Sequence, residues 1–177
     1  MIIVLLGEGC QISWDFDKLE IEKNRSIFEW FLSVKFTDIL YIINKLVVGD
    51  ELCVTRQYIY RGNLFMDNTD IRTTHYTEDK MIDMLKRRGA RFIEQVKSDE
   101  RILFVRYEHS EYTTTIDDIF EFSRLINEIN PKCIYNLLLF ANHGKTDLLE
   151  DLPKNVYHVL YNSDISVLGD YIKELEC

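Results

Sequence analysis

The 177-residue sequence is poor in the residues that separate chains into independent units. It has two prolines and seven glycines, and no proline- or glycine-rich stretch, low-complexity tract or internal repeat interrupts it. These absences, with a length typical of one hydrophobic core, predict a single domain over residues 1–177. Alanine is also scarce, with two residues against twenty isoleucines, which indicates an AT-rich coding genome such as that of a low-GC bacterium or a large DNA virus.

Long hydrophobic runs are absent as well. No apolar run approaches the roughly 18–20 residues that span a bilayer. The apolar residues 1–6 lack a basic flank and are too few for the apolar segment of a secretory signal, so we expect a buried strand there. The sequence therefore predicts a cytoplasmic protein without a membrane association.

Basic residues are outnumbered, 21 against 30 acidic ones, and the net charge is −9. This balance argues against a nucleic-acid partner, because phosphate binding needs clustered lysine and arginine. The one basic cluster, Lys86-Arg87-Arg88, is predicted to lie on a solvated helix face. The acidic surface and ten tyrosines suit a protein partner better.

The four cysteines, at positions 10, 53, 133 and 177, are scattered and have no CxxC spacing. In a reducing compartment this pattern predicts free thiols, and we expect Cys53 and Cys133 to be packed inside the protein. The histidines do not stand at metal-ligand spacing from the cysteines. The sequence predicts neither a metal site nor a cofactor.

The second half of the chain alternates short apolar runs with amphipathic segments. Strands are predicted at 102–107, 133–140 and 156–161, and helices at 78–97, 115–129 and 165–176. Thr77 and Thr115 are the expected N-caps, and Asn130-Pro131 should end the middle helix. Strands apolar on both faces, alternating with helices, favour an α/β fold with a mainly parallel, doubly wound sheet and helices on both faces.

The first half is less regular. We expect a strand at 2–6, a helix that begins at Thr37, and an irregular insertion around 48–75 with a hairpin or edge strands near Arg61-Gly62-Asn63. The four strands at 2–6, 102–107, 133–140 and 156–161 should run parallel in one sheet.

Polar residues follow several of these strands. They are Gly7-Glu8-Gly9-Cys10, Glu108-His109, Asn142-His143-Gly144 and Asn162-Ser163-Asp164. Ligands of parallel sheets bind beyond the carboxyl ends of the strands, so these groups could gather in one site. The alternative interpretation is that loops are simply polar.

Gly-x-Gly-Cys is the most informative local pattern. Gly7 and Gly9 permit a tight turn, and a helix beginning there would lower the pKa of the Cys10 thiol and supply N–H groups for an oxyanion. Phosphate binding is less well supported, because the third glycine of GxGxxG and the P-loop lysine are missing. The alternative for Cys10 is a small buried hydrophobic residue.

A cysteine nucleophile needs a base within hydrogen-bond reach. His75 is the first candidate, because it precedes the helix at 78–97 in a loop, although a surface role is the alternative. His143 is the second. His109 and His158 are expected to be structural or solvated.

Several motifs resemble, in order, those of a family of predicted papain-like cysteine peptidases of unknown function. They are Leu6-Gly7-Glu8-Gly9-Cys10 for Leu-Gly-x-x-Cys, Ser26-Ile27-Phe28-Glu29-Trp30 for Pro-Phe-Asp-Trp, an isolated His75, Arg91-Phe92, and Leu103-Phe104-Val105-Arg106 for Phe-Val-Arg. The resemblance covers roughly residues 2 to 142. Ile27 stands where the family has proline, and Glu29 where it has aspartate, which lengthens the carboxylate arm by one methylene.

The resemblance implies Cys10 as nucleophile, His75 as base, Glu29 as the residue that orients the base, and Trp30 as a wall of the cleft. Papain-like folds carry the cysteine on a helix and the histidine in an antiparallel sheet. The periodicity instead predicts a parallel sheet, so we expect an α/β fold that is not a true papain.

Two functions are favoured, and nucleotide- or sugar-binding enzymes that use the strand ends without a covalent thiol are left open as a third class. The first is a cysteine hydrolase of peptidase, amidase or esterase type, acting on a peptide, protein or small molecule. The second is a non-catalytic protein-binding module on the same scaffold. The secondary site candidates are Gly7, Gly9, Trp30, Arg106, Asn142 and His143.

Overall fold

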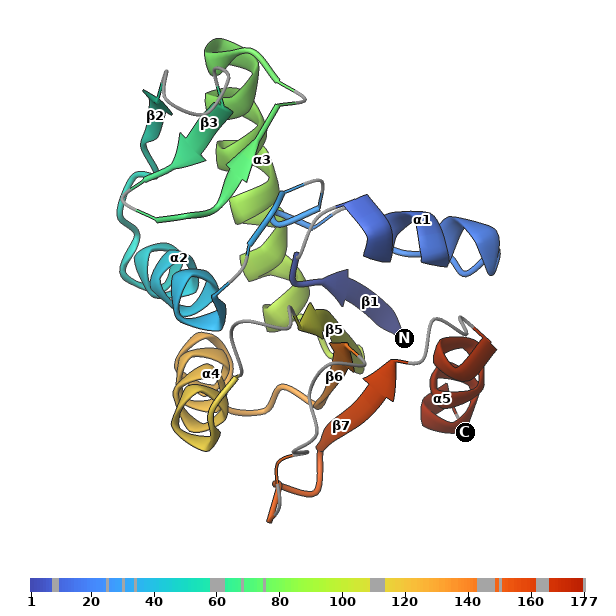
Figure 1. Ribbon diagram of the computed structural model, residues 1–177. Helices are drawn as coiled ribbons and strands as arrows, with labels where there is room; N and C mark the ends of the chain where they lie inside the picture. Colours follow the sequence, from blue (N-terminus) through green and yellow to red (C-terminus); the bar gives the residue numbers. More distant parts are fainter. Residues whose placement is uncertain are drawn as a thin grey trace.

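A four-stranded parallel sheet forms the centre of the protein (Figure 1). The computed structural model describes residues 1–7, 10–24, 26–29, 31–33, 35–57, 63–67, 69–74, 76–108, 114–142, 149, 151–161 and 166–176. The strands of the main sheet are β1 (Ile2–Leu5), β5 (Ile102–Glu108), β6 (Tyr135–Asn142) and β7 (Val156–Tyr161). They lie in the order β1-β5-β6-β7, and each neighbouring pair is parallel, which confirms the predicted fold class.

Helices cover both faces of this sheet, as predicted (Figure 1). On one face lie α2 (Phe36–Val48), α3 (Glu78–Lys97) and α4 (Ile116–Ile129); on the other lie α1 (Cys10–Lys18) and α5 (Ser166–Glu176). Successive strand residues alternate between the two cores, so Phe104 packs with the first group and Leu103 and Val105 with the second. In the part of the chain that the structure describes, no helix is both long and apolar enough to cross a membrane.

The predicted element boundaries differ from the structure in a few places. The strand expected at 133–140 begins two residues later, because Cys133 N–H donates to the Asn130 carbonyl and completes a turn first. Thr115 caps α4 in a capping box with Asp118, as expected. Thr77 occupies the N-cap of α3, but its side chain makes no cap hydrogen bond.

The insertion between α2 and α3 contains a second, antiparallel sheet. Its strands are β2 (Val54–Gln57), β3 (Asn63–Met66) and β4 (Arg72–Thr73), in that order. The β2–β3 pair is the hairpin expected around Arg61-Gly62-Asn63. Leu64 and Met66 are buried in the same core as α2, α3 and α4, so the insertion packs on the main fold.

Candidate active site at the carboxyl edge of the sheet

The connections that follow β1 and β5 leave the sheet toward opposite faces. After β1 the chain enters α1 on one face, whereas after β5 it enters α4 on the other (Figure 1). These two strands are neighbours in the sheet. In α/β sheets, ligands bind outside the carboxyl ends of the strands at such a topological switch point. The candidate site therefore lies beyond Leu5 and Glu108.

Cys10 is the first residue of α1. The sequence predicted it in a turn after the first strand and did not predict this helix. The helix forms because Ile12 and Phe16, four residues apart, are fully buried against the sheet. The first N–H groups of a helix have no partner within it, and its dipole is positive at that end. The structure describes the backbone of Cys10 and not its thiol.

Gly7 makes the turn that leads toward α1. Its φ is +88°, a left-handed conformation that favours glycine. A Cβ atom at this position would overlap the Ser33 hydroxyl and lie 3.6 Å from the Cβ of Phe28. The absence of a side chain therefore lets Phe28 and Ser33 pack against the end of β1.

The Arg106 guanidinium is hydrogen-bonded both to the residue that follows β1 and to Ser33. Arg106 is 1% exposed, and its Nη1 donates to the Leu6 carbonyl (3.2 Å) and to the Ser33 hydroxyl (3.3 Å). Its Nη2 donates to the Ser33 carbonyl (3.1 Å), and the guanidinium lies over the Phe36 ring, 5.2 Å from the centroid. Arg106 thus positions the turn before Cys10 by binding backbone carbonyls.

Glu29 lies in the segment that packs on Gly7. Its side chain is buried, and its Oε2 is 3.9 Å from Nη1 of Arg88 on α3. Arg88 Nη1 donates to the backbone carbonyls of Ser26 (3.0 Å) and Glu29 (3.3 Å) instead. Within the described residues, Glu29 Oε2 has no hydrogen-bond donor. This buried carboxylate oxygen can therefore accept a hydrogen bond from an N–H or O–H group.

The burial of Arg88 corrects the expectation that Lys86-Arg87-Arg88 is a solvated helix face. Arg88 is 5% exposed because it follows Leu85 by three residues and precedes Phe92 by four, on the inward stripe of α3. Lys86 does face solvent, where it pairs with Glu51 at 2.8 Å. The helical period thus places Lys86 and Arg87 on the exposed side of α3 and Arg88 on the buried side.

Glu108 and His158 form a buried pair on β5 and β7. His158 Nε2 lies 2.8 Å from Glu108 Oε2, and the N–H of Thr114 donates to Glu108 Oε1 at 2.9 Å. The N–H of Leu149 donates to His158 Nδ1 at 3.1 Å, so Nδ1 is an acceptor and Nε2 carries the proton. Both ring nitrogens are therefore engaged, and of the two alternatives predicted for His158, structural or solvated, its buried side chain excludes the second.

Burial by itself raises the pKa of the Glu108 carboxyl. The hydrogen bonds from His158 and Thr114 outweigh this effect and hold the pKa below its ordinary value. Glu108 is therefore an anion that ties the end of β5 to β7 and to the segment entering α4. The sequence predicted that Glu108 follows a strand, but it did not indicate that His158 is its hydrogen-bond partner.

On the opposite face, Asp15 fastens α1 to β5. This carboxylate is fully buried and accepts hydrogen bonds from the Tyr107 hydroxyl (2.9 Å) and from Gln11 Nε2 (2.7 Å). An acid at position 15, between the core residues Ile12 and Phe16, was the sequence signal for such a bond. The bond fixes the first turns of α1 relative to the sheet.

The remaining candidates are only partly placed. His75, Trp30, Gly9 and His143 lie outside the described residues, and Asn142 ends β6 with its backbone alone described. The structure therefore brings together Gly7, Arg106 and the segment of Glu29 beside the start of α1. Among the described side chains, no group of three or more His, Cys, Asp or Glu could hold a metal ion.

No protein-family model matches this chain, and neither a curated protein nor a solved structure does. The resemblance to papain-like peptidases remains a prediction from the motifs.

Proposed function

We propose that this chain is a cysteine-dependent hydrolase or acyl-transfer enzyme with Cys10 as its nucleophile. The observation that carries the proposal is the start of α1 at Cys10, where the connections of β1 and β5 diverge. The positive end of a helix stabilises a thiolate and lowers its pKa. The free N–H groups of the first turn can donate to the oxyanion that forms when the thiolate attacks a carbonyl.

His75 is the proposed general base, and Glu29 the residue that orients it. The imidazole takes the thiol proton as sulfur bonds to the carbonyl carbon, then gives it to the leaving amine or alkoxide. Water, deprotonated by the same imidazole, releases the acyl group and restores the thiol. The buried Glu29 Oε2, which has no donor among the described residues, supports an acceptor role toward an imidazole N–H.

Gly7 and Arg106 act on this chemistry through the backbone. Arg106 donates to the Leu6 carbonyl, and Gly7 adopts the left-handed turn that follows. Both are positioning residues, since each fixes the path of the chain into α1. A site held within about 0.5 Å by such supports keeps a nucleophile aligned.

The proposed substrates are peptides, proteins or small molecules with a cleavable amide, ester or thioester carbonyl. A cytoplasmic location fits this chemistry, because a reducing compartment keeps a nucleophilic thiol free.

The direct test is acyl transfer from p-nitrophenyl acetate, followed by release of p-nitrophenolate and by peptide mapping of the acetylated cysteine. We expect a thioester at Cys10 and loss of turnover in Cys10→Ala. Cys53→Ala is the matched control, because Cys53 is an exposed thiol outside the site. Undiminished turnover in Cys10→Ala would overturn the proposal, and absence of any thioester at Cys10 would favour the non-catalytic binding module.

A further inference from the structure

An exposed tryptophan lies one helical turn beyond Cys10 on α1. Trp14 is 51% exposed, although an indole is among the largest apolar side chains. Residues four apart share one face of a helix, so positions 10 and 14 of α1 lie one above the other. The rise of an α-helix separates two such Cα atoms by about 6 Å. An apolar surface therefore lies close to the start of the helix.

Helix geometry directs this surface toward the carboxyl edge of the sheet. Side chains of a helix lean toward its N-terminus and cover the turn before their own Cα. For Trp14 that is the turn of residues 10–13, which follows β1. Among the described side chains of α1, Trp14 is the only large apolar one that is exposed. The exposed aromatic residues Tyr41 and Phe120 belong to α2 and α4, on the other face of the sheet.

Trp14 is not needed to attach α1 to the sheet. Ile12 and Phe16 are fully buried, and the carboxylate of Asp15 accepts a hydrogen bond from the Tyr107 hydroxyl at 2.9 Å. These contacts fix the helix, so the position of the indole is set before a ligand binds. Half of the Trp14 side chain is exposed whatever its other contacts, and this half is open to a ligand.

The polar residues beside Trp14 on α1 are already engaged within the protein. Asp17 lies 2.6 Å from the ammonium of Lys23, and Lys18 lies 3.8 Å from the buried Asp15. Gln11 Nε2 donates to the same Asp15 carboxylate at 2.7 Å. The exposed side of α1 therefore combines an apolar ring with charges that are already paired, which suits an uncharged apolar group better than an ion.

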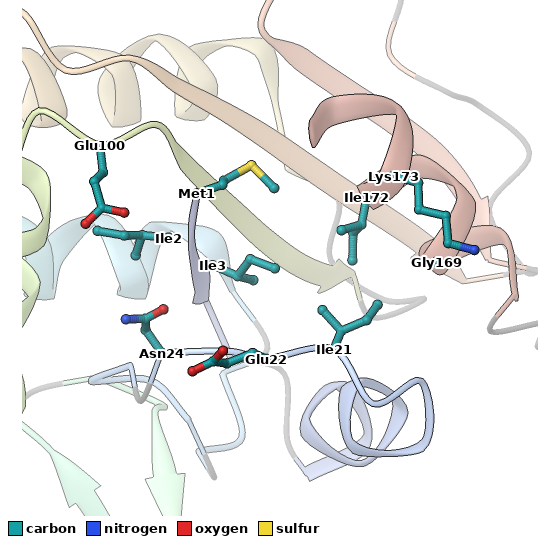
Figure 2. Close-up of a pocket in the computed structure, with 10 residues that line it drawn as sticks. All are labelled: Met1, Ile2, Ile3, Ile21, Glu22, Asn24, Glu100, Gly169, Ile172 and Lys173. Carbon is teal, nitrogen blue, oxygen red and sulfur yellow. The ribbon is translucent and has the colours of Figure 1, made fainter. Parts of the chain in front are cut away.

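The cavity at the amino ends of β1 and β5 offers a ligand little apolar surface (Figure 2). Its volume is about 520 Å³, but Ile3 and Ile172 in its wall are only 3% and 2% exposed. The charged side chains of Glu22, Glu100 and Lys173 line it as well. It also lies at the opposite end of β1 from α1, so the apolar surface nearest to the candidate active site is that of Trp14.

We propose that Trp14 binds the acyl part of the substrate and selects acyl groups that carry an aromatic ring. The acyl group stays bonded to Cys10 between the two steps of the reaction, whereas the leaving group departs with a proton. A contact made by α1 itself is therefore kept through both steps. Aromatic acyl groups gain most, because two rings attract each other beyond the area that they bury. This inference rests on the function proposed for Cys10 and names its substrate class.

The test compares two esters that share the p-nitrophenyl leaving group, the acetate and the 3-phenylpropionate. The ratio of their kcat/KM values isolates the effect of the acyl group. We expect Trp14→Ala to reduce the preference of the unmodified chain for the 3-phenylpropionate about fivefold, chiefly by raising KM for that ester, and Trp14→Phe to keep most of it. An unchanged ratio in Trp14→Ala would overturn the inference. An equal loss with both esters would do the same, because Trp14 would then contact the leaving group or only support the helix.

Phe120→Ala is the matched control. It removes an exposed aromatic ring of α4, on the other face of the sheet, and should leave the ratio unchanged. A loss in Phe120→Ala equal to that in Trp14→Ala would contradict the assignment. Trp14→Gln is a second variant without a ring, in case Trp14→Ala fails the check of folding by circular dichroism.

Peptide mapping of acylated Cys10 separates this inference from the function on which it rests. If both esters acylate Cys10 and the ratio does not change in Trp14→Ala, the inference fails and the proposed function stands. If neither ester acylates Cys10, the proposed function fails and the inference fails with it.

Discussion

The imidazole of His158 and the carboxylate of Glu108 lie 2.8 Å apart, fully buried, on the two strands that flank β6. The N–H groups of Leu149 and Thr114 donate to the far sides of the pair. Every donor in this chain of hydrogen bonds therefore meets an acceptor. Its polarity is fixed because a backbone N–H can only donate.

Glu108→Gln should break this order without changing the volume of the side chain. The amide must present its NH₂ to either the Thr114 N–H or the His158 Nε2–H, and a change of tautomer would only move the conflict to Leu149. A buried donor left without an acceptor costs about 1–3 kcal/mol. Urea unfolding at pH 7 should show a loss of that size, while the exposed Glu94→Gln stays within about 0.5 kcal/mol of the unmodified chain.

The same comparison should depend on pH. The folded-state pKa of Glu108 is below its ordinary value, so its contribution is full above the unfolded-state pKa of about 4.3 and is lost as pH falls through the folded value. The difference in unfolding free energy between the unmodified chain and Glu108→Gln should stay constant from pH 7 to 5 and shrink below about pH 4. A difference that grows on acidification would show that the carboxylate is not stabilised by its partners.

Three glycines allow the strain at Gly7 to be separated from its crowding. Gly7→Ala should cost about 2–4 kcal/mol, because it combines a left-handed φ with overlap of the Ser33 hydroxyl. Gly49→Ala should cost only about 1–2 kcal/mol, since its φ is +78° but no atom lies within 4 Å of the added carbon. Gly169→Ala, in helix α5, should be neutral or stabilising. Thermal unfolding would rank the three, and equal losses at Gly7 and Gly49 would show that the contact with Ser33 is unimportant.

Arg106→Lys tests whether the hydrogen bonds of the Arg106 guanidinium position the turn before Cys10. Lysine keeps the charge but cannot reach the Leu6 and Ser33 carbonyls with two parallel donors. We expect the rate of Cys10 alkylation at pH 7 to fall several-fold while labelling of Cys53 is unchanged. Arg124→Lys, at an exposed pair on α4, is the control. Equal Cys10 rates in a folded Arg106→Lys protein would mean that the guanidinium only stabilises the fold.

The main sheet was predictable because its strands are short runs apolar on both faces. Residues 156–161 and 78–97 form β7 and α3 with the predicted boundaries, since turns and caps flank clear periodic patterns. Helix α1 was missed because it is short and its apolar residues form no clear helical stripe. Trp14 stands between Ile12 and Phe16 and is 51% exposed, so the place of the helix is set by the contacts of Ile12 and Phe16 with the sheet. Likewise, Cys53 is exposed rather than packed, because Leu52 takes the inward position beside it.

The site was predictable only as a location. Polar residues at strand ends pointed to the carboxyl edge, and the parallel sheet brings the ends of β1, β5 and β6 to that edge. The pairing of Glu29 with Arg88, and of Glu108 with His158, joins residues 59 and 50 positions apart. No local pattern encodes such long-range partners, because they depend on how the helices and strands pack together.

The central claim is that Cys10 is a thiolate nucleophile paired with His75. The pH dependence of its alkylation by limiting iodoacetamide, followed by mass spectrometry from pH 5.5 to 9, tests this most directly. Cys53 controls for exposure, and Cys133 is a slow reference because burial raises the pKa of its thiol. In a thiolate–imidazolium pair each charge stabilises the other, so loss of the histidine raises the pKa of the thiol.

We predict that Cys10 reacts faster than Cys53 at pH 6, and that His75→Ala moves its rate profile to higher pH. His143→Ala should have a smaller effect, and Glu29→Gln should act in the direction of His75→Ala but more weakly, because it influences the thiol only through the imidazole. Circular dichroism would confirm that each variant is folded. A larger shift in His143→Ala would make His143 the base, and a Cys10 profile that no variant moves would contradict the account.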